Sequence, residues 1–342
     1  MKCYDSRGTA FLRMGRSDPR ESACELWWSG SGIRTRIACA RLEIEAEAPD
    51  GDHLPWLAVT VDGEPVARFA LAAGRNRYAI FESMDGAVAH EVAILRDTQP
   101  TDRDAGPLVL LAVYSDGEPS APAPRDLLVE FMGDSLTVGE GAVGPVSAQE
   151  WRMAWISNQF AFPTLAAELL NAEKRIVALG GWGAYKSFDG DPTHTIGGIY
   201  ERLCAVVPGG DVDYDFSAQR PADAVVINLG TNDASALGKM NPAELPEGIA
   251  AFERSAAALM AQVRNHNPDA VIVWAYGLCG GDLEAPIREA VERIRAGGDD
   301  RVYYLALEDC GNDHGSRSHP GRASHLRAAA QIAGALKQWM MR

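Results

Sequence analysis

The first third of the chain alternates apolar and polar residues with a period of two, as half-buried β-strands do. In RLEIEAEA (41–48), the leucine, isoleucine and alanine side chains point to one face and the glutamates to the other. Two apolar runs flank Asp62-Gly63, a dipeptide that favours a tight β-hairpin. Further strands are expected at 77–82, 90–96 and 107–113. The pattern predicts an antiparallel β-sandwich of the jelly-roll type.

From residue 127 the pattern changes to nearly continuous apolar strands that alternate with helical stretches. The strands are predicted at 127–132, 175–179, 223–229, 270–276 and 302–307, and the helices at 159–172, 197–207, 246–266, 284–296 and 323–341. Strands that are apolar on both faces are typical of a buried parallel sheet. Alternation with helices then predicts a doubly wound, three-layer α/β domain. We therefore place a β-domain at 1–120, a Pro- and Ala-rich linker at 121–126 and an α/β domain at 127–342.

Charge and composition exclude several classes of partner. The net charge of −15 argues against nucleic acid, because phosphate binding requires clustered Lys and Arg. The sequence has no apolar run long enough to span a bilayer, and its first residues lack the apolar core of a signal peptide, so we expect a cytoplasmic protein. The six cysteines contain no CxxC pair, and we interpret them as reduced thiols. Asp189, Asp191 and His194 lack the spacing of a metal site, so neither a metal nor a cofactor is expected.

Residues with catalytic chemistry follow the predicted strands, where parallel sheets bind their ligands. Ser135 follows the first strand, a glycine-rich block (180–183) the second, Asn232 the third and His319 the fifth. A serine attacks a carbonyl carbon when a nearby histidine takes its proton. Backbone N–H groups and an amide side chain can stabilise the oxyanion that forms. These four elements, in this order, predict one site for acyl transfer.

The blocks GDSL (133–136), GTND (230–233) and HP (319–320) resemble those of the SGNH, or GDSL-type, hydrolases. The resemblance covers 127–342 and implies a flavodoxin-like domain with a parallel five-stranded sheet and an ester-hydrolase activity. It implies that Ser135 is the nucleophile and that His319 is the base. It further implies that the oxyanion hole consists of the Ser135 and Gly181 N–H groups and the Asn232 side chain.

The first half of the chain resembles the β-sandwich that precedes the hydrolase domain in carbohydrate esterase family 2. The segments that carry this resemblance are LWWSGSGIRTRIACARLEIEAEA, AVTVDGEPV and HEVAILRDTQ. Members of that family remove acetyl groups from sugar hydroxyls. The substrate implied is an acetylated mono- or oligosaccharide, and Trp182 is a candidate to stack on the sugar, or else to pack between elements.

The sequence departs from the family at the acid that orients the histidine. The usual position, three residues before His319, is Ser316, and the position two residues before it is Arg317. Two alternatives remain. Either a backbone carbonyl in the 312–318 loop holds the histidine, as in Ser-His dyads of family 2, or Asp313 (or Asp309) reaches it.

Several residues also have a purely structural interpretation. Ser135 could be only a helix N-cap, and Asp134 is interpreted as a turn residue. Asn232 could form only an Asx-turn. For the backbone N–H that donates to the oxyanion, Gly183 is the alternative to Gly181. His325 is interpreted as structural.

Three functions follow as alternatives. The first is a serine esterase that deacetylates carbohydrates, of the acetyl-xylan or 6-O-acetyl-sugar type. The second is a lipid or thioester acyl hydrolase of the same superfamily. The third is a glycan-binding protein with a degenerate hydrolase domain, which the missing acid at Ser316 motivates. The sugar, the acyl-length preference and the oligomeric state do not follow from the sequence.

Overall fold

The computed structural model describes residues 1–341, within which the strands form three sheets of five strands each. The chain divides into two compact units. The first unit comprises Met1–Arg125, Arg152–Ala154 and Arg202–Ala218. The second comprises Asp126–Trp151, Trp155–Glu201 and the chain from Gln219 onward.

The first unit is a sandwich of two antiparallel sheets, as the alternating pattern predicts. One sheet has the order β1-β10-β5-β8, with β3 paired to β10. It is built from β1 (Lys2–Asp5), β3 (Cys24–Leu26), β5 (Leu42–Ala48), β8 (Gly74–Phe81) and β10 (Leu108–Ser115). The other has the order β2-β4-β9-β6-β7. It is built from β2 (Leu12–Met14), β4 (Gly32–Ile37), β6 (Trp56–Val61), β7 (Glu64–Ala70) and β9 (His90–Arg96).

Two local predictions for this unit are confirmed. Along β5, the leucine, isoleucine and alanine side chains are buried while the glutamates between them are at least partly exposed. Strands β6 and β7 pair antiparallel around Asp62 and Gly63, both of which have positive φ. This is the backbone conformation of a two-residue hairpin turn that matches the twist of the strands. Apolar residues of both sheets, including Ile44 and Val59, form one core.

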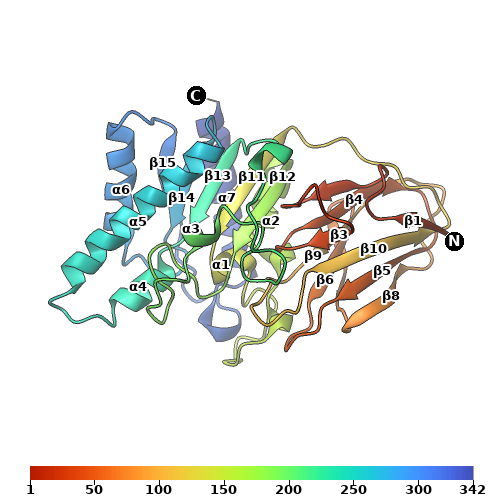
Figure 1. Ribbon diagram of the computed structural model, residues 1–342, viewed down its shortest axis with the longest axis horizontal. Coiled ribbons are helices and arrows are strands. Elements are labelled where there is room, and N and C mark those ends of the chain that lie inside the picture. Colours follow the sequence, from red (N-terminus) through yellow and green to blue (C-terminus); the bar gives the residue numbers. More distant parts are fainter. Residues whose placement is uncertain (342) are drawn as a thin grey trace. The chain divides into compact units, whose positions relative to one another are not determined.

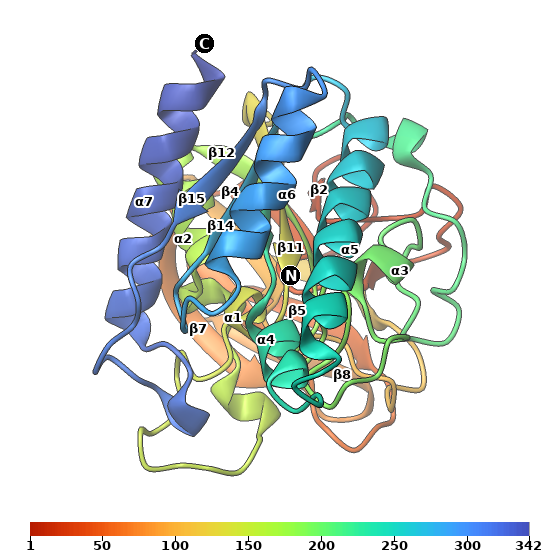
Figure 2. The ribbon, with the colours of Figure 1, turned by 90° about the vertical axis from the view of Figure 1, so that its left-hand side faces the viewer.

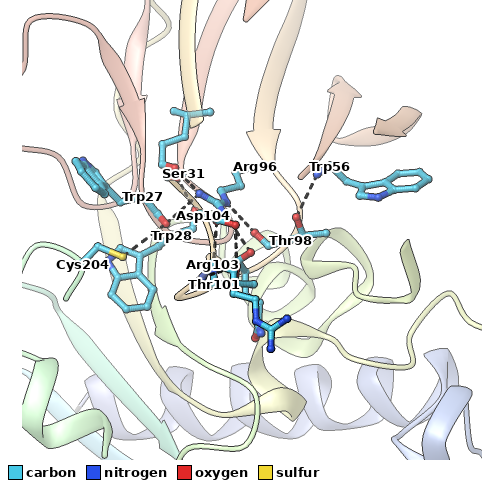
Figure 3. Close-up of polar contacts among 12 residues, drawn as sticks. Trp27, Trp28, Ser31, Trp56, Arg96, Thr98, Thr101, Arg103, Asp104 and Cys204 are labelled. Atoms are coloured by element: carbon cyan, nitrogen blue, oxygen red, sulfur yellow. Dashed lines mark hydrogen bonds and ion pairs between the residues drawn. The ribbon is translucent and has the colours of Figure 1, made fainter. Parts of the chain in front are cut away.

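A buried arginine at the end of β9 organises the loop that follows this strand. The guanidinium of Arg96 is fully buried, donates to the backbone carbonyls of Leu26 and Thr98, and pairs with Asp104 at 3.1 Å (Figure 3). Burial lowers the pKa of Arg96, because a charge is less stable away from water. Trp28 is also buried and donates its indole N–H to the Leu203 carbonyl at 2.6 Å. Trp28 is thus a packing residue.

The second unit is a doubly wound α/β domain. Its parallel sheet has the order β12-β11-β13-β14-β15. The strands are β11 (Leu127–Gly133), β12 (Ala172–Ala178), β13 (Ala224–Asn228), β14 (Val271–Tyr276) and β15 (Val302–Ala306). The helices are α1 (Ser135–Val138), α2 (Phe162–Leu170), α3 (Ile196–Ile199), α4 (Thr231–Leu237), α5 (Leu245–His266), α6 (Glu284–Ala296) and α7 (Arg322–Met340). Short 3-10 turns occur at Met153–Trp155, Asn158–Phe160, Phe216–Ala218 and Ser316–Ser318.

The strand order reverses at β11, and this reversal locates the binding site. The chain moves from β11 to β12 in one direction and then from β13 to β15 in the other, so right-handed connections place helices on both faces. Helices α5 and α6 pack together, as do α2 and α7, and Figures 1 and 2 show α5 and α6 side by side on one side of the strands. Doubly wound sheets bind their ligands outside the carboxyl ends of the strands at such a reversal, which here are those of β11 and β13.

The helix predicted at 197–207 is wrong. Helix α3 ends at Ile199, and the chain beyond it forms irregular turns in which Cys204 N bonds Gly210 O at 2.9 Å. Gly197 and Gly198 weaken the helix, since glycine costs about 1 kcal/mol per helical position. The apolar residues in the second half of the predicted helix, Leu203, Cys204 and Val207, are instead buried in irregular turns of the first unit.

Candidate active site

The turn after β11 places Ser135 at the start of a helix. Asp134 is the N-cap of α1, and its Oδ1 accepts the Leu136 N–H at 3.0 Å. The alternative in which Ser135 is only the cap is therefore wrong. A side chain at Gly133 would meet Thr137 Oγ1 at 2.0 Å, so the turn requires glycine there. The tight turn presents the hydroxyl of Ser135 at the carboxyl edge of the sheet.

His319 lies beside Ser135 although 184 positions separate them in the sequence. Its Nε2 is 3.0 Å from Ser135 Oγ, and its Nδ1 is 3.1 Å from the carbonyl oxygen of Arg317. Because a carbonyl can only accept, Nδ1 carries the proton and Nε2 is free to accept the hydroxyl proton of Ser135. The arrangement can therefore activate the serine.

The two candidate acids contact other groups. Asp313 Oδ2 accepts the Ser324 N–H at 2.5 Å, near the start of α7. The carboxylate of Asp309 accepts the N–H groups of Gly280 at 2.9 Å and Gly311 at 2.8 Å. The geometry thus favours the alternative in which a backbone carbonyl, that of Arg317, orients the histidine.

The glycine-rich loop after β12 supplies backbone donors. Gly181 has a φ of +85°, and within residues 1–341 neither its N–H nor that of Ser135 has a hydrogen-bond acceptor. The Gly183 N–H is directed to the carbonyl of His194 at 3.4 Å. Gly181 is therefore better placed than Gly183 to donate to an oxyanion.

Asn232 connects this loop to the serine turn. Its Nδ2 donates to Asp134 Oδ2 at 3.1 Å and to the Trp182 carbonyl at 2.8 Å. These partners are 98 and 50 positions away, and the Ala234 N–H that an Asx-turn would use bonds the Gly230 carbonyl at 2.8 Å, so the Asx-turn alternative is wrong. Both amide protons already have acceptors, and Asn232 could donate to an oxyanion only by sharing one of them.

Asp233 holds the glycine-rich loop in place. Its buried carboxylate accepts the N–H groups of Ala184 at 3.0 Å, Tyr185 at 2.7 Å and Lys186 at 2.9 Å. Burial raises the pKa of Asp233, and the three N–H donors oppose that shift. Burial, together with the charges of Asp233 and Glu140, raises the pKa of Asp134 to about 7. The serine turn is thus surrounded by carboxyl groups.

The remaining predicted residues have plainer environments. Trp182 is half-buried and stacks on His194, with ring centroids 4.9 Å apart. His325 is fully buried, accepts the Phe162 N–H at 3.3 Å, and has a pKa that burial lowers to about 4. The structural interpretation of His325 is confirmed, and Trp182 keeps one ring face against His194. Asp191 accepts the N–H and hydroxyl of Thr193, and no cluster among residues 1–341 has three side chains suited to a metal ion.

Sequence reasoning missed one buried charge beside His319. Glu140, in the loop after α1, has a side chain that is 6% exposed, and its Oε2 lies 3.7 Å from His319 Nε2. Its Oε1 accepts a hydrogen bond from the guanidinium of Arg317. A charged residue within the glycine-rich run VGEGAVG (138–144) was the available signal.

Comparison with known proteins identifies the family. The profile of the GDSL-like Lipase/Acylhydrolase family matches residues 131–331, which include Ser135 and His319. The chain belongs to this family of ester hydrolases. The profile of the Carbohydrate esterase 2 N-terminal domain matches residues 13–124 of the same GDSL-like hydrolase.

Individual relatives match nearly the whole length of this chain. Cellulase/esterase CelE of Acetivibrio thermocellus is 28% identical over an alignment of 349 residues that covers 97% of this chain but 40% of that protein. This chain thus spans well under half the length of that relative. An acetylxylan esterase / glucomannan deacetylase of Cellvibrio japonicus is 25% identical over 96% of this chain and 88% of its own length.

Solved structures agree with the fold. The acetyl xylan esterase Est2A of Butyrivibrio proteoclasticus has a TM-score of 0.93 at 26% identity, covering 99% of this chain and 100% of that one. A family two carbohydrate esterase of Clostridium thermocellum in complex with cellohexaose has a TM-score of 0.85 at 25% identity, covering 96% and 99%. Over the described part of this hydrolase, no helix has the length and apolar character needed to cross a membrane.

Proposed function

We propose that the protein is a serine esterase that hydrolyses acetyl esters on carbohydrates. The observation that carries the proposal is the contact of His319 with Ser135 at 3.0 Å on one side and with the Arg317 carbonyl at 3.1 Å on the other. The esterase and acetylxylan esterase names of full-length relatives support carbohydrate as the substrate class.

The reaction begins with attack of Ser135 Oγ on the acetyl carbonyl carbon while His319 Nε2 takes the hydroxyl proton. The Ser135 and Gly181 N–H groups are directed to the oxyanion, and Asn232 joins them by sharing an amide proton. His319 then gives its proton to the departing sugar oxygen, which leaves an acetyl-serine. A water molecule, deprotonated by the same histidine, attacks this ester and releases acetate and free Ser135.

The test is acetate release from p-nitrophenyl acetate and from acetylated xylo- and gluco-oligosaccharides. We expect Ser135→Ala to lose at least about 10³-fold in kcat, because no other group supplies the nucleophile. The matched control is Ser187→Ala, which removes a hydroxyl that contacts Asp189 and Asp191 instead of His319. Equal rates for wild type and Ser135→Ala would refute the proposal.

An acyl-length series tests the alternative of a lipid or thioester hydrolase. Turnover that is highest for acyl chains beyond about six carbons would favour that alternative over a deacetylase. Binding of oligosaccharides without turnover of any ester would instead favour a glycan-binding protein.

A further inference from the structure

Glu140 lies where it touches both partners of the proposed catalytic pair. Its backbone N–H donates to the Ser135 carbonyl at 2.9 Å, which fixes the loop after α1 against the serine turn. Its carboxylate is buried, with Oε2 3.7 Å from His319 Nε2. A carboxylate within about 4 Å of an imidazole stabilises the imidazolium form. Glu140 therefore faces the atom of His319 that receives the proton of Ser135.

The other oxygen of Glu140 accepts from the guanidinium of Arg317, the residue whose carbonyl holds His319 Nδ1. Arg317 and the next residue, Ser318, have φ values of +55° and +56°, which L-residues with side chains adopt at a cost. Such a conformation persists only where its surroundings hold it. Besides the contact of its carbonyl with His319, the bond of the Arg317 N–H to the Ala148 carbonyl at 2.8 Å and the pairing of its side chain with Glu140 hold this residue.

We propose that Glu140 is a positioning residue that replaces the acid missing before His319. Through the guanidinium it keeps the Arg317 carbonyl directed at Nδ1, and through its second oxygen it stabilises the positive charge that forms on the histidine ring. A carbonyl offers only a partial charge, so a full charge nearby supplies what the dyad lacks. The inference deepens the proposed function and rests on it.

The usual position of the acid could not have served here. Ser316 is 1% exposed. Its hydroxyl lies so close to Gly144 that a Cβ added to Gly144 would come within 2.4 Å of the hydroxyl oxygen. A larger acidic side chain would have to displace this loop. The charge consequently comes from Glu140, whose Oε2 lies 3.7 Å from Nε2.

The test compares Glu140→Gln and Arg317→Lys with a matched control, Asp299→Asn. Asp299 forms a partly buried two-bond pair with Arg264 at 2.8 and 3.1 Å, next to the amino ends of β14 and β15. We expect Glu140→Gln to lower kcat for p-nitrophenyl acetate about 10²-fold, with KM within about threefold, because misorientation of a catalytic group acts on the chemical step. Arg317→Lys should lose less, since lysine keeps the charge but not the fork. Asp299→Asn should match wild type.

A second measurement separates this inference from the proposed substrate. A fluorophosphonate forms a bond from phosphorus to Ser135 Oγ, releases fluoride, and leaves the serine proton on His319, so its labelling rate reports activation without any sugar ester. We expect Glu140→Gln to slow labelling about as much as it lowers kcat. If wild type is labelled but releases no acetate from sugars, the proposed substrate is wrong and the labelling rates still decide the role of Glu140.

Three results would overturn the inference. One is a Glu140→Gln variant with kcat and labelling within twofold of wild type. Another is an equal loss in Asp299→Asn, which would indicate a general effect of removing an ion pair. The third is a wild-type protein whose Ser135 the probe does not label. Ser135 would then not be an activated nucleophile, and the proposed function would fail together with the inference.

Discussion

Asp233 gives the sharpest test of how the glycine-rich loop is held. Its carboxylate accepts three backbone N–H groups, those of Tyr185 and Lys186 on Oδ1 and that of Ala184 on Oδ2. An asparagine can keep its single oxygen on the first two, but its NH2 group then faces the Ala184 N–H. Asp233→Asn therefore replaces one acceptor by a donor and makes two charged hydrogen bonds neutral.

The expected loss of stability follows bond by bond. Loss of the Ala184 bond and weakening of the other two should cost about 3 kcal/mol of stability. This figure allows for a partial gain, because burial already disfavours the charge that Asp233→Asn removes. Asp233→Ala leaves three buried N–H groups without an acceptor and should cost about 5 kcal/mol. For a domain of about 200 residues, about 2–4 °C of melting temperature corresponds to each kcal/mol.

Thermal unfolding by circular dichroism at a fixed pH measures both variants, with Asp191→Asn as the matched control. Asp191 also accepts a backbone N–H in this loop, that of Thr193, but its side chain is 40% exposed, so we expect almost no change. The kcat of both Asp233 variants should fall too, since the loop carries Gly181. Melting temperatures for Asp233→Asn and Asp233→Ala within about 1 °C of wild type would refute the reasoning, and so would a larger loss for Asn than for Ala.

Two further predictions concern buried charge elsewhere in the chain. Asp104→Ala leaves the fully buried guanidinium of Arg96 without this carboxylate and should destabilise the first unit by about 3 kcal/mol. The control Asp102→Ala, at an exposed position, should cause no such loss. Equal melting temperatures for the two variants would contradict the prediction. His325 has a pKa lowered by burial to about 4, so the unfolded chain binds its proton first and stability falls as pH decreases from 6.5 to 4. Urea unfolding measures the free energy of unfolding at each pH. Over this range His325→Gln should lose less stability than wild type, by about 1.4 kcal/mol per pH unit. Parallel pH profiles of the two proteins would contradict this role of His325.

The sheets were predictable because strand periodicity records which faces are buried. Alternation along β5 and the nearly continuous apolar run of β11, which only Glu130 interrupts, correspond to one-sided and two-sided burial. The 197–207 prediction failed because the segment is divided between the two units, with Tyr200 buried in the second and Leu203 in the first, and a local pattern does not say which partner buries a residue. Tertiary packing then overrides helix periodicity.

The proximity of Ser135 and His319 was predictable for a topological reason. Parallel strands bring their carboxyl ends to one edge, so residues that follow β11 and β15 converge whatever their separation in sequence. The partner of His319 Nδ1 was not predictable, because it depends on the backbone conformation of Arg317. Glu140 was missed for a similar reason, since its place in the run VGEGAVG marks a charged loop residue but does not say that its side chain turns inward.

The carboxyl groups around Ser135 are better explained by orientation than by stability. The pKa of Asp134 is raised from 3.8 to about 7, so between these pH values the folded protein keeps a proton that the unfolded chain has lost. Stability contributed by this group therefore falls as pH rises through that range and then stays constant, opposite in sign to His325. A fold optimised for stability alone would not crowd Asp134, Asp233 and Glu140 together. Each, however, binds a group that must stay fixed near the serine: the Asn232 amide, the glycine-rich loop and the Arg317 side chain. The destabilisation is then the cost of holding donors and carbonyls in one geometry before the substrate arrives.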